Sequence, residues 1–197
     1  MTRFSKSEIK QKQLELSEWQ TPEKMNEKVG EVSGEILFTQ AGTAFLREGW
    51  IAAELGRLRG ADQVRVPLET FPDFQIRFGN IIEDFEATEV DDPNRRRGDE
   101  YKTPDRGVVD DPYEDWVERA NGLSQWLRVV CQKKASKNYY TGTNLAIYLN
   151  VGTYGTWRSE IQQSMISSTE SVRDKFSSVW VLWEDHAYQV WPDRVRL

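Results

Sequence analysis

The chain has 197 residues, of which 38% are hydrophobic and 29% are charged, and its formal net charge is −6. This length and composition predict one globular domain with a core of its own. The negative charge argues against a protein that coats nucleic acid through bulk charge. One cysteine and one histidine cannot supply the four ligands of a structural zinc site. No apolar run approaches the ~20 residues that a membrane helix needs.

The N-terminal part of the chain is predicted to be helical. Residues 5–19 have the pattern of an exposed helix. We expect residues 1–40 to form a helical arm ahead of a domain at residues 41–197. The arm lacks the apolar centre of a signal peptide, so we expect a cytoplasmic protein without a membrane partner.

Helix ends in this part carry recognisable signals. Thr21 is predicted to be an N-cap, with Pro22 at the first helical position. The helical pattern then continues, with a break near Gly30 or Gly34, until Gly60, which is predicted to be a C-cap.

Three strands and a long loop are predicted next. The strands are Gln63–Leu68, Phe74–Phe78 and Ile81–Val90, and Gly79-Asn80 is typical of a tight hairpin turn between the last two. Residues 91–111 are polar, and a loop of this length is usually functional or disordered.

The rest of the chain alternates helices and strands. Helices are predicted at Pro112–Lys137 and Trp157–Phe176, and strands at Asn144–Val151, Val179–Trp183 and Ala187–Trp191. The strand at Asn144 is almost continuously apolar, so we expect it at the centre of the sheet. The order α-β-β-β-α-β-α-β-β predicts an α/β (α+β) fold, a mixed sheet flanked by helices.

The hairpin between residues 71 and 89 carries the first functional signal. Its second strand places Asp84, Glu86 and Thr88 on one face, and residues 83–92 contain six acids. Neighbouring carboxylates are costly unless a positive charge lies among them, and a divalent cation held by oxygen ligands is the usual solution.

A second signal is an acid on the apolar side of a helix. At ~100° per residue, Glu48 lies within ~80° of Phe45, Ile51 and Leu55. A carboxylate on a core-facing stripe needs a partner or a metal ion. The alternatives are an ion pair with Arg47 or Arg77, or a side chain that reaches past the edge of the stripe.

These residues together resemble the PD-(D/E)XK nuclease superfamily, which has the restriction-endonuclease-like fold. The matching residues are Pro72-Asp73 and, after twelve intervening residues, Glu86-Ala87-Thr88. The inward-facing Glu48 and the order α-β-β-β-α-β also match, over roughly residues 41–155. Within the superfamily the chain is similar to small bacterial proteins described as endonuclease candidates, which share a segment like Arg96–Tyr101 (RRGDEY).

The resemblance implies an endonuclease that hydrolyses phosphodiester bonds with Mg²⁺ or Mn²⁺. By this resemblance Asp73, Glu86 and Glu48 are metal ligands, and the backbone carbonyl of Ala87 adds an oxygen. Such a metal acidifies bound water and neutralises charge at the phosphate. DNA is expected as substrate more than RNA, and a homodimer is a further expectation.

The chain departs from the family where the motif has lysine, because Thr88 carries no charge. One interpretation is that the basic group comes from elsewhere, from Lys134 or Lys137 on the following helix, or from Lys102. The other is a nuclease-like fold without catalysis that serves as a protein- or nucleic-acid-binding module. A third hypothesis is a structural or oligomerising domain whose acidic hairpin is merely solvated.

A basic run follows the acidic hairpin. Arg95, Arg96, Arg97 and Lys102 are predicted to bind phosphate, because arginine can clamp a phosphate with two parallel hydrogen bonds. An arginine of this run is also a candidate for the missing lysine. The alternative is that the run balances the acids on either side of it.

Overall fold

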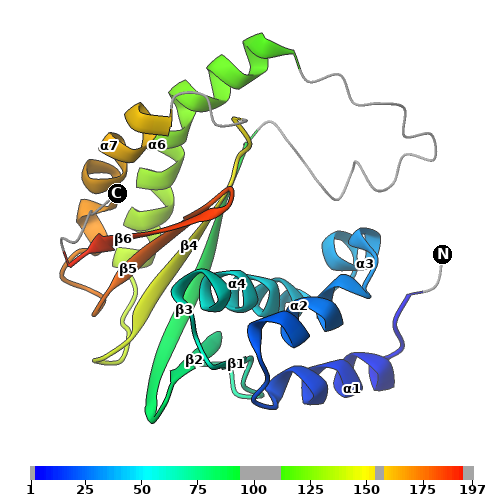
Figure 1. Ribbon diagram of the computed structural model, residues 1–197. Coiled ribbons are helices and arrows are strands. Elements are labelled where there is room, and N and C mark those ends of the chain that lie inside the picture. The colour runs from blue at the N-terminus through cyan, green and yellow to red at the C-terminus, as the bar shows by residue number, and fades with distance from the viewer. Residues whose placement is uncertain (1–2, 94–111, 154–157, 193–197) are drawn as a thin grey trace. The chain divides into compact units, whose positions relative to one another are not determined.

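The computed structural model describes residues 3–93, 112–153 and 158–192 (Figure 1). These residues form two compact units. Unit 1 comprises residues 3–87, and unit 2 comprises residues 88–93, 112–153 and 158–192. Residues of the predicted N-terminal arm therefore belong to the same unit as the first strands. The basic run at Arg95, Arg96, Arg97 and Lys102 lies outside the described residues.

Four helices open unit 1, and local sequence explains where they begin. They are α1 (Lys6–Ser17), α2 (Pro22–Gly30), α3 (Gly34–Thr39) and α4 (Ala44–Arg59). The Thr21 hydroxyl accepts a hydrogen bond from the backbone N–H of Lys24, with Pro22 as the first helical residue, which confirms the predicted cap. Gly60 ends α4 at φ 69°, the left-handed conformation that favours glycine, as predicted.

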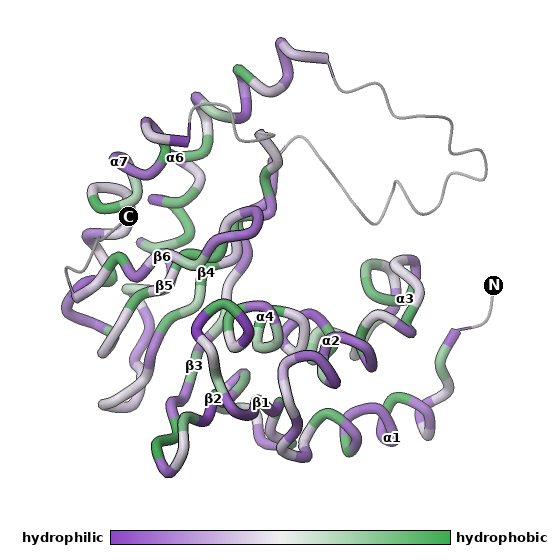
Figure 2. Tube along the Cα trace, in the orientation of Figure 1, coloured by the Kyte–Doolittle hydropathy of each residue, from purple (hydrophilic) through white to green (hydrophobic). Residues whose placement is uncertain are grey.

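Helix α1 is mostly polar and is anchored at its last turn by one buried side chain. Figure 2 shows it as mostly hydrophilic, with short hydrophobic stretches. Its side chain Leu16 is fully buried, and Leu16 Cδ2 lies 3.0 Å from the point where a Cβ on Gly49 of α4 would stand. The absence of a side chain at Gly49 thus lets α1 pack closely on α4.

The strands form one six-stranded mixed sheet in the order β1-β2-β3-β4-β5-β6. Pairs β1–β2, β2–β3 and β5–β6 are antiparallel and pair β4–β5 is parallel. The predicted α/β class and element order from α4 onward are confirmed. The bounds are β1 (Gln63–Arg65), β2 (Phe74–Phe78), β3 (Ile81–Asp91), β4 (Asn144–Asn150), β5 (Val179–Trp183) and β6 (His186–Trp191).

The sheet face of unit 1 that packs on α4 is apolar. Phe74 of β2 and Phe85 of β3 are fully buried and stack with ring centroids 4.9 Å apart. Gly56 of α4 crosses β1 so closely that an added Cβ would stand 2.6 Å from the Val64 side chain. Strand alternation leaves the neighbouring residues on the opposite face.

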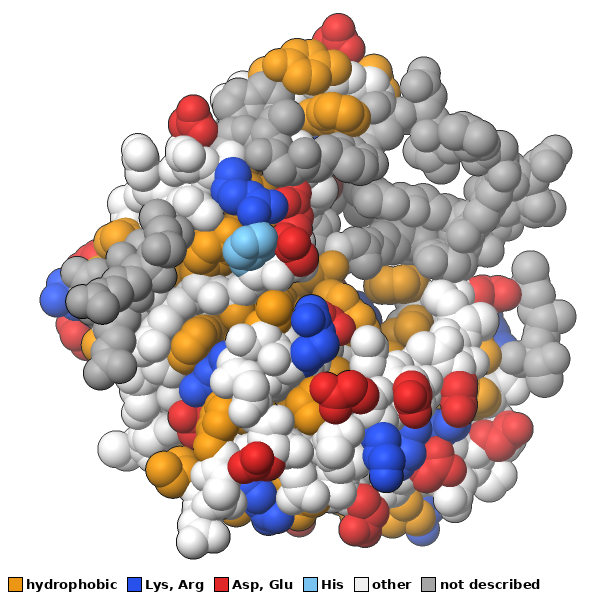
Figure 3. Space-filling model, in the orientation of Figure 1, with side chains coloured by type: hydrophobic (Ala, Val, Ile, Leu, Met, Phe, Trp, Pro, Cys, Tyr) orange, Lys and Arg blue, Asp and Glu red, His pale blue; other side chains and the backbone are white. Residues whose placement is uncertain are grey.

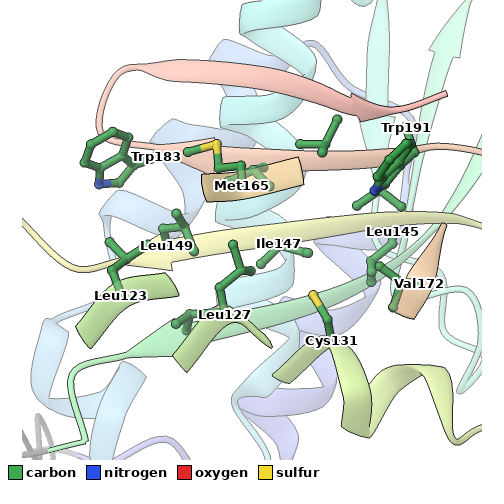
Figure 4. Packing of buried hydrophobic residues seen from close by; sticks show 14 of the residues in the cluster. Leu123, Leu127, Cys131, Leu145, Ile147, Leu149, Met165, Val172, Trp183 and Trp191 are labelled. Carbon is green, nitrogen blue, oxygen red and sulfur yellow. The ribbon is translucent and has the colours of Figure 1, made fainter. Parts of the chain in front are cut away.

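Unit 2 is built around a larger apolar cluster (Figure 4). Helix α6 (Tyr113–Ala135) points Leu123, Leu127 and Cys131 at β4, and α7 (Arg158–Thr169) adds Met165. A short 3₁₀ turn, η1 (Glu170–Val172), follows α7. Strand β4 is buried at every position but Tyr148 and lies between β3 and β5, so its predicted central place is confirmed. No helix in the described part of the chain is long and apolar enough to cross a membrane.

Candidate functional site

A pocket of about 270 Å³ in unit 1 lies where β1 ends and β2 begins. Side chains of α1 and α4 and the segment between the two strands line it. These residues include three acids and no base. They are Gln13, Phe45, Glu48, Val66, Pro67, Leu68, Glu69, Thr70, Pro72 and Asp73. The lining therefore favours a cation over an anion.

The pocket exists because the chain leaves the sheet after Arg65. The Val66 N–H donates to the backbone carbonyl of Leu16 in α1 at 2.9 Å, away from β2. Pro67 has no N–H to continue the ladder. The strand predicted to reach Leu68 accordingly stops at Arg65. The segment bends round to Phe74, where pairing with β3 starts.

Asp73 ties the start of β2 to the middle of β3. Its N–H donates to the Phe85 carbonyl at 3.0 Å, and its Oδ2 accepts from the Ala87 N–H at 2.8 Å. Since Phe74 pairs with Phe85, the next position outward on each strand is Asp73 and Glu86. The fold therefore brings together the two parts of the predicted motif, which are separated by twelve residues in sequence.

Glu48 reaches the same pocket from α4. It is half-buried in a helix whose neighbouring positions Phe45 and Ile51 are buried, in agreement with its predicted place on the apolar side. Arg77, one of its two predicted alternative partners, donates to Gln63 at 2.9 Å and lies over Trp19. Glu48 and Asp73 are thus two carboxylates lining one pocket.

The expected group of three carboxylates is not seen. In the described ranges, no group of three or more Asp, Glu, His or Cys side chains is placed to hold a metal ion. Glu86 is half-buried in β3 and does not line the pocket. Mg²⁺, however, usually keeps several waters and needs only one or two protein carboxylates. A hydrated Mg²⁺ would therefore need no third protein carboxylate beside Glu48 and Asp73.

Other acids of the predicted cluster have partners of their own. Glu83 pairs with Arg59 of α4 through two hydrogen bonds, at 2.6 and 3.2 Å. Asp84 accepts from Gln75 at 2.6 Å, and Asp91 accepts from Asn150 at 2.8 Å. The acidic hairpin therefore does not gather its charges round one cation, because each of these carboxylates faces a different neighbour.

The candidates for the missing lysine are spread along the chain. Thr88 is half-buried in β3. Lys134 is half-buried on α6 in unit 2, whereas the pocket residues belong to unit 1. Lys137 follows α6 and is exposed. Each remains a candidate for the basic group by prediction alone.

Two pocket residues escaped sequence reasoning. Glu69 is exposed at the pocket, four residues before Asp73, and an acid so close to the Pro-Asp pair was a signal that could have been used. Gln13 lies on α1, and no pattern in the sequence connects that helix with residues 66–73.

A second polar cluster lies on unit 2 at the turn between β5 and β6. The single histidine, His186, is pale blue in Figure 3 among blue and red side chains. Arg158 of α7 pairs with Glu184 at 2.8 Å, and His186 Nδ1 contacts Asp185 at 2.5 Å. The hydrogen bond from His186 holds the pKa of Asp185 below its ordinary value. The charges of this cluster are compensated internally, which favours a role in holding the turn.

Comparisons of the chain with protein-family models, with curated proteins and with solved structures found no match. Inference about function therefore rests on the residues and geometry of the pocket in unit 1.

Proposed function

We propose that the pocket of unit 1 is the active site of a metal-dependent endonuclease that hydrolyses phosphodiester bonds in DNA, as the likeness to the PD-(D/E)XK superfamily implies. One observation carries the proposal. Glu48 and Asp73 line a single pocket, and Asp73 is hydrogen-bonded to the strand that holds Glu86-Ala87-Thr88. Two carboxylates that are far apart in sequence thus line one pocket, beside the strand that carries the second part of the motif.

Asp73 would hold the ion with one oxygen while the other keeps its bond to Ala87. This bond fixes the direction of the carboxylate, which lowers the entropy cost of binding. Glu48, on the rigid helix α4, would be the second ligand. When bound, Mg²⁺ supplies positive charge at the phosphate and acidifies a water molecule. Glu69, exposed at the pocket, adds negative potential that draws the cation in.

Thr88 favours a second candidate function. Its hydroxyl can donate or accept a hydrogen bond but supplies no positive charge at a phosphate. If no other basic group takes the place of the lysine, the domain binds metal and nucleic acid without cleaving. The alternative function is then an inactive nuclease-like module that binds protein or nucleic acid.

Nicking of supercoiled plasmid DNA with Mg²⁺ or Mn²⁺ tests the proposal. We expect Asp73→Asn to lose at least ~100-fold in rate, because even residues that only support metal ligands cost 10–100-fold. Asparagine can still accept from the Ala87 N–H, so the fold is retained. The nicking rate of Glu48→Gln should fall in the same way. Glu54→Gln is the matched control, since Glu54 lies on the same helix but binds Asn26 and Arg57.

Equal nicking by the wild type and Asp73→Asn would contradict the proposal, since cleavage would then come from another site or a contaminant. Isothermal titration with Mn²⁺ separates the two candidate functions. Binding of Mn²⁺ that Asp73→Asn abolishes, in a wild type that does not nick, would support the inactive binding module.

A further inference from the structure

The face of the unit 1 sheet opposite the Phe74–Phe85 stack is polar and carries two arginines. Arg65 of β1 lies opposite Gln75 of β2, and Arg77 of β2 lies opposite Gln63 of β1. All four residues are half-buried, and they alternate with the buried Val64 and Ile76 along the two strands. We call Trp19, Gln63, Arg65, Gln75 and Arg77 the arginine face.

Trp19 holds the two guanidinium groups together. The guanidinium carbons of Arg65 and Arg77 lie 4.6 and 3.9 Å from the centroid of the Trp19 ring. The next residue, Gln20, bridges to Val64 of β1 through two backbone hydrogen bonds, at 3.2 and 2.8 Å. Backbone pairing thus fixes the indole on the sheet, and the stacking stabilises each cation by about 0.5–1 kcal/mol.

Neither arginine forms an ion pair with any residue in the described part of the chain. Arg65 Nε donates to Gln75 at 2.6 Å and Arg77 donates to Gln63 at 2.9 Å, both neutral amides. Gln75 in turn donates to Asp84 at 2.6 Å, so an amide separates Arg65 from that carboxylate.

Three other arginines among the described residues are neutralised directly by carboxylates. Arg59 pairs with Glu83, Arg158 with Glu184 and Arg173 with Glu170. Two like charges held beside one ring without such a partner repel each other, and this repulsion opposes folding. A bound anion would relieve it, and planar guanidinium groups match phosphate oxygens in geometry.

We propose that the arginine face binds the phosphodiester backbone of DNA that extends along β2 to Asp73 of the acidic pocket. The proposal rests on the proposed nuclease function and names the surface that holds its substrate. Asp73 precedes Gln75 by two residues, which is about 7 Å along a strand. A ligand of repeating phosphates can therefore contact Arg65 and Arg77 and extend to Asp73. An isolated small anion would meet only the arginines.

DNA binding in EDTA tests this proposal separately from cleavage. The probe is a fluorescein-labelled DNA duplex of about 20 base pairs, followed by anisotropy between about 50 and 200 mM NaCl. Arg65→Gln/Arg77→Gln should bind about tenfold or more weakly at low salt. Its plot of log K against log salt should be shallower by about 2, because each lost phosphate contact removes about 0.9 from the slope.

Two further variants make the test specific. Arg173→Gln is the matched control, because Arg173 also lies over an indole, 4.8 Å from the Trp191 centroid, but pairs with Glu170 in unit 2. It should bind DNA as the wild type does. Arg65→Lys/Arg77→Lys keeps both charges and should keep most of the salt slope. Circular dichroism melts confirm that each variant is folded.

Wild-type affinity in Arg65→Gln/Arg77→Gln, or an equal loss in Arg173→Gln, would overturn the arginine face as the DNA surface. Binding of polyglutamate with no binding of the duplex would do the same and would indicate an acidic protein as the partner. Arginine-dependent binding without any nicking would support this surface while contradicting the nuclease proposal. Asp73→Asn should bind the duplex in EDTA at least as tightly as the wild type, because it removes a negative charge.

Discussion

The two units of the chain use their sheet strands in opposite ways. In unit 2, β4 and β5 are almost wholly buried, and their apolar side chains meet those of α6 and α7 (Figure 4). In unit 1, β1 and β2 bury one face and leave the other half-buried, and that second face carries arginines and glutamines. The pocket lined by Glu48 and Asp73 is also in unit 1.

This difference in strand burial indicates that the two units have different roles. A strand buried on both faces has no free face for charged groups, because a buried charge must be paired. A strand that buries only one face can offer the other to a ligand. Unit 2 thus contributes apolar stability, whereas unit 1 contributes the polar surface on which both proposals rest.

The largest expected effect on stability comes from the apolar cluster of unit 2. Leu127→Ala should lower the free energy of unfolding by about 2–5 kcal/mol, because Leu127 is fully buried between α6 and the sheet. Val129→Ala is the matched control on the same helix, since Val129 is 52% exposed and should cost at most about 0.5 kcal/mol. Urea denaturation measures both. An equal loss of unfolding free energy in the two variants would contradict a stabilising role for the apolar cluster of unit 2.

A smaller effect is expected at the tightest contact of unit 1. A Cβ on Gly56 would lie 2.6 Å from Val64, a fully buried side chain on β1. Gly56→Ala should therefore destabilise by about 1–2 kcal/mol, since overpacking outweighs the gain in helix propensity. Gly30→Ala in α2 should be neutral or stabilising, because no neighbouring group lies within 4 Å of the position that the added Cβ would take. If both changes stabilised the fold, α4 would not approach β1 as closely as described.

The pH dependence of stability tests whether the apolar cluster of unit 2 excludes water at Cys131. Burial raises the pKa of the Cys131 thiol from 9.0 to about 12. Above the unfolded pKa the unfolded chain loses this proton and the native chain keeps it, so stability falls as pH rises. Between about pH 8 and about pH 10, the wild type should lose roughly 1–1.5 kcal/mol more than Cys131→Ala.

The same thiol should resist maleimide labelling in the native state, because only the thiolate reacts readily. Rapid labelling of the folded protein at neutral pH would show that the cluster admits solvent at Cys131. Parallel pH profiles for the wild type and Cys131→Ala would lead to the same conclusion.

The smallest expected effect on stability comes from the N-cap of α2 in unit 1. Thr21→Ala removes the hydroxyl that accepts from Lys24 and should cost about 1 kcal/mol in thermal or urea unfolding. Thr21→Ser keeps the hydroxyl and should restore most of that loss. An equal loss in both variants would mean that the threonine methyl, and not the cap, stabilises α2.

Local patterns in the sequence predicted most of the fold. Thr21, Pro22 and Gly60 mark helix ends, and the predicted bounds of β2 and β5 agree with the structure. These features depend on dihedral preferences and hydrophobic period within a few residues. The prediction was less accurate where a distant residue intervenes. β1 stops at Arg65 because Val66 bonds to Leu16, some fifty residues earlier in the chain.

Sequence patterns named two of the acids that line the pocket, Glu48 and Asp73, but did not predict how the acids are arranged. The period of α4 placed Glu48 on the apolar side, and the Pro-Asp pair marked Asp73. The sequence did not show that Glu83 binds Arg59 and Asp84 binds Gln75, so that these acids do not join one cluster. Ion pairs and hydrogen bonds between elements depend on which strands and helices become neighbours, which local propensity does not specify.

By itself the sequence determined the element order from α4 onward, the apolar strand at the centre of the sheet and the place of Glu48 on the apolar side of α4, because all three follow from hydrophobic period and turn chemistry. Only the tertiary structure decided that Asp73 binds the Ala87 N–H, that Glu48 and Asp73 share a pocket, and that Trp19 gathers Arg65 and Arg77. These contacts join residues up to about sixty positions apart, and their geometry is fixed by strand register and helix packing.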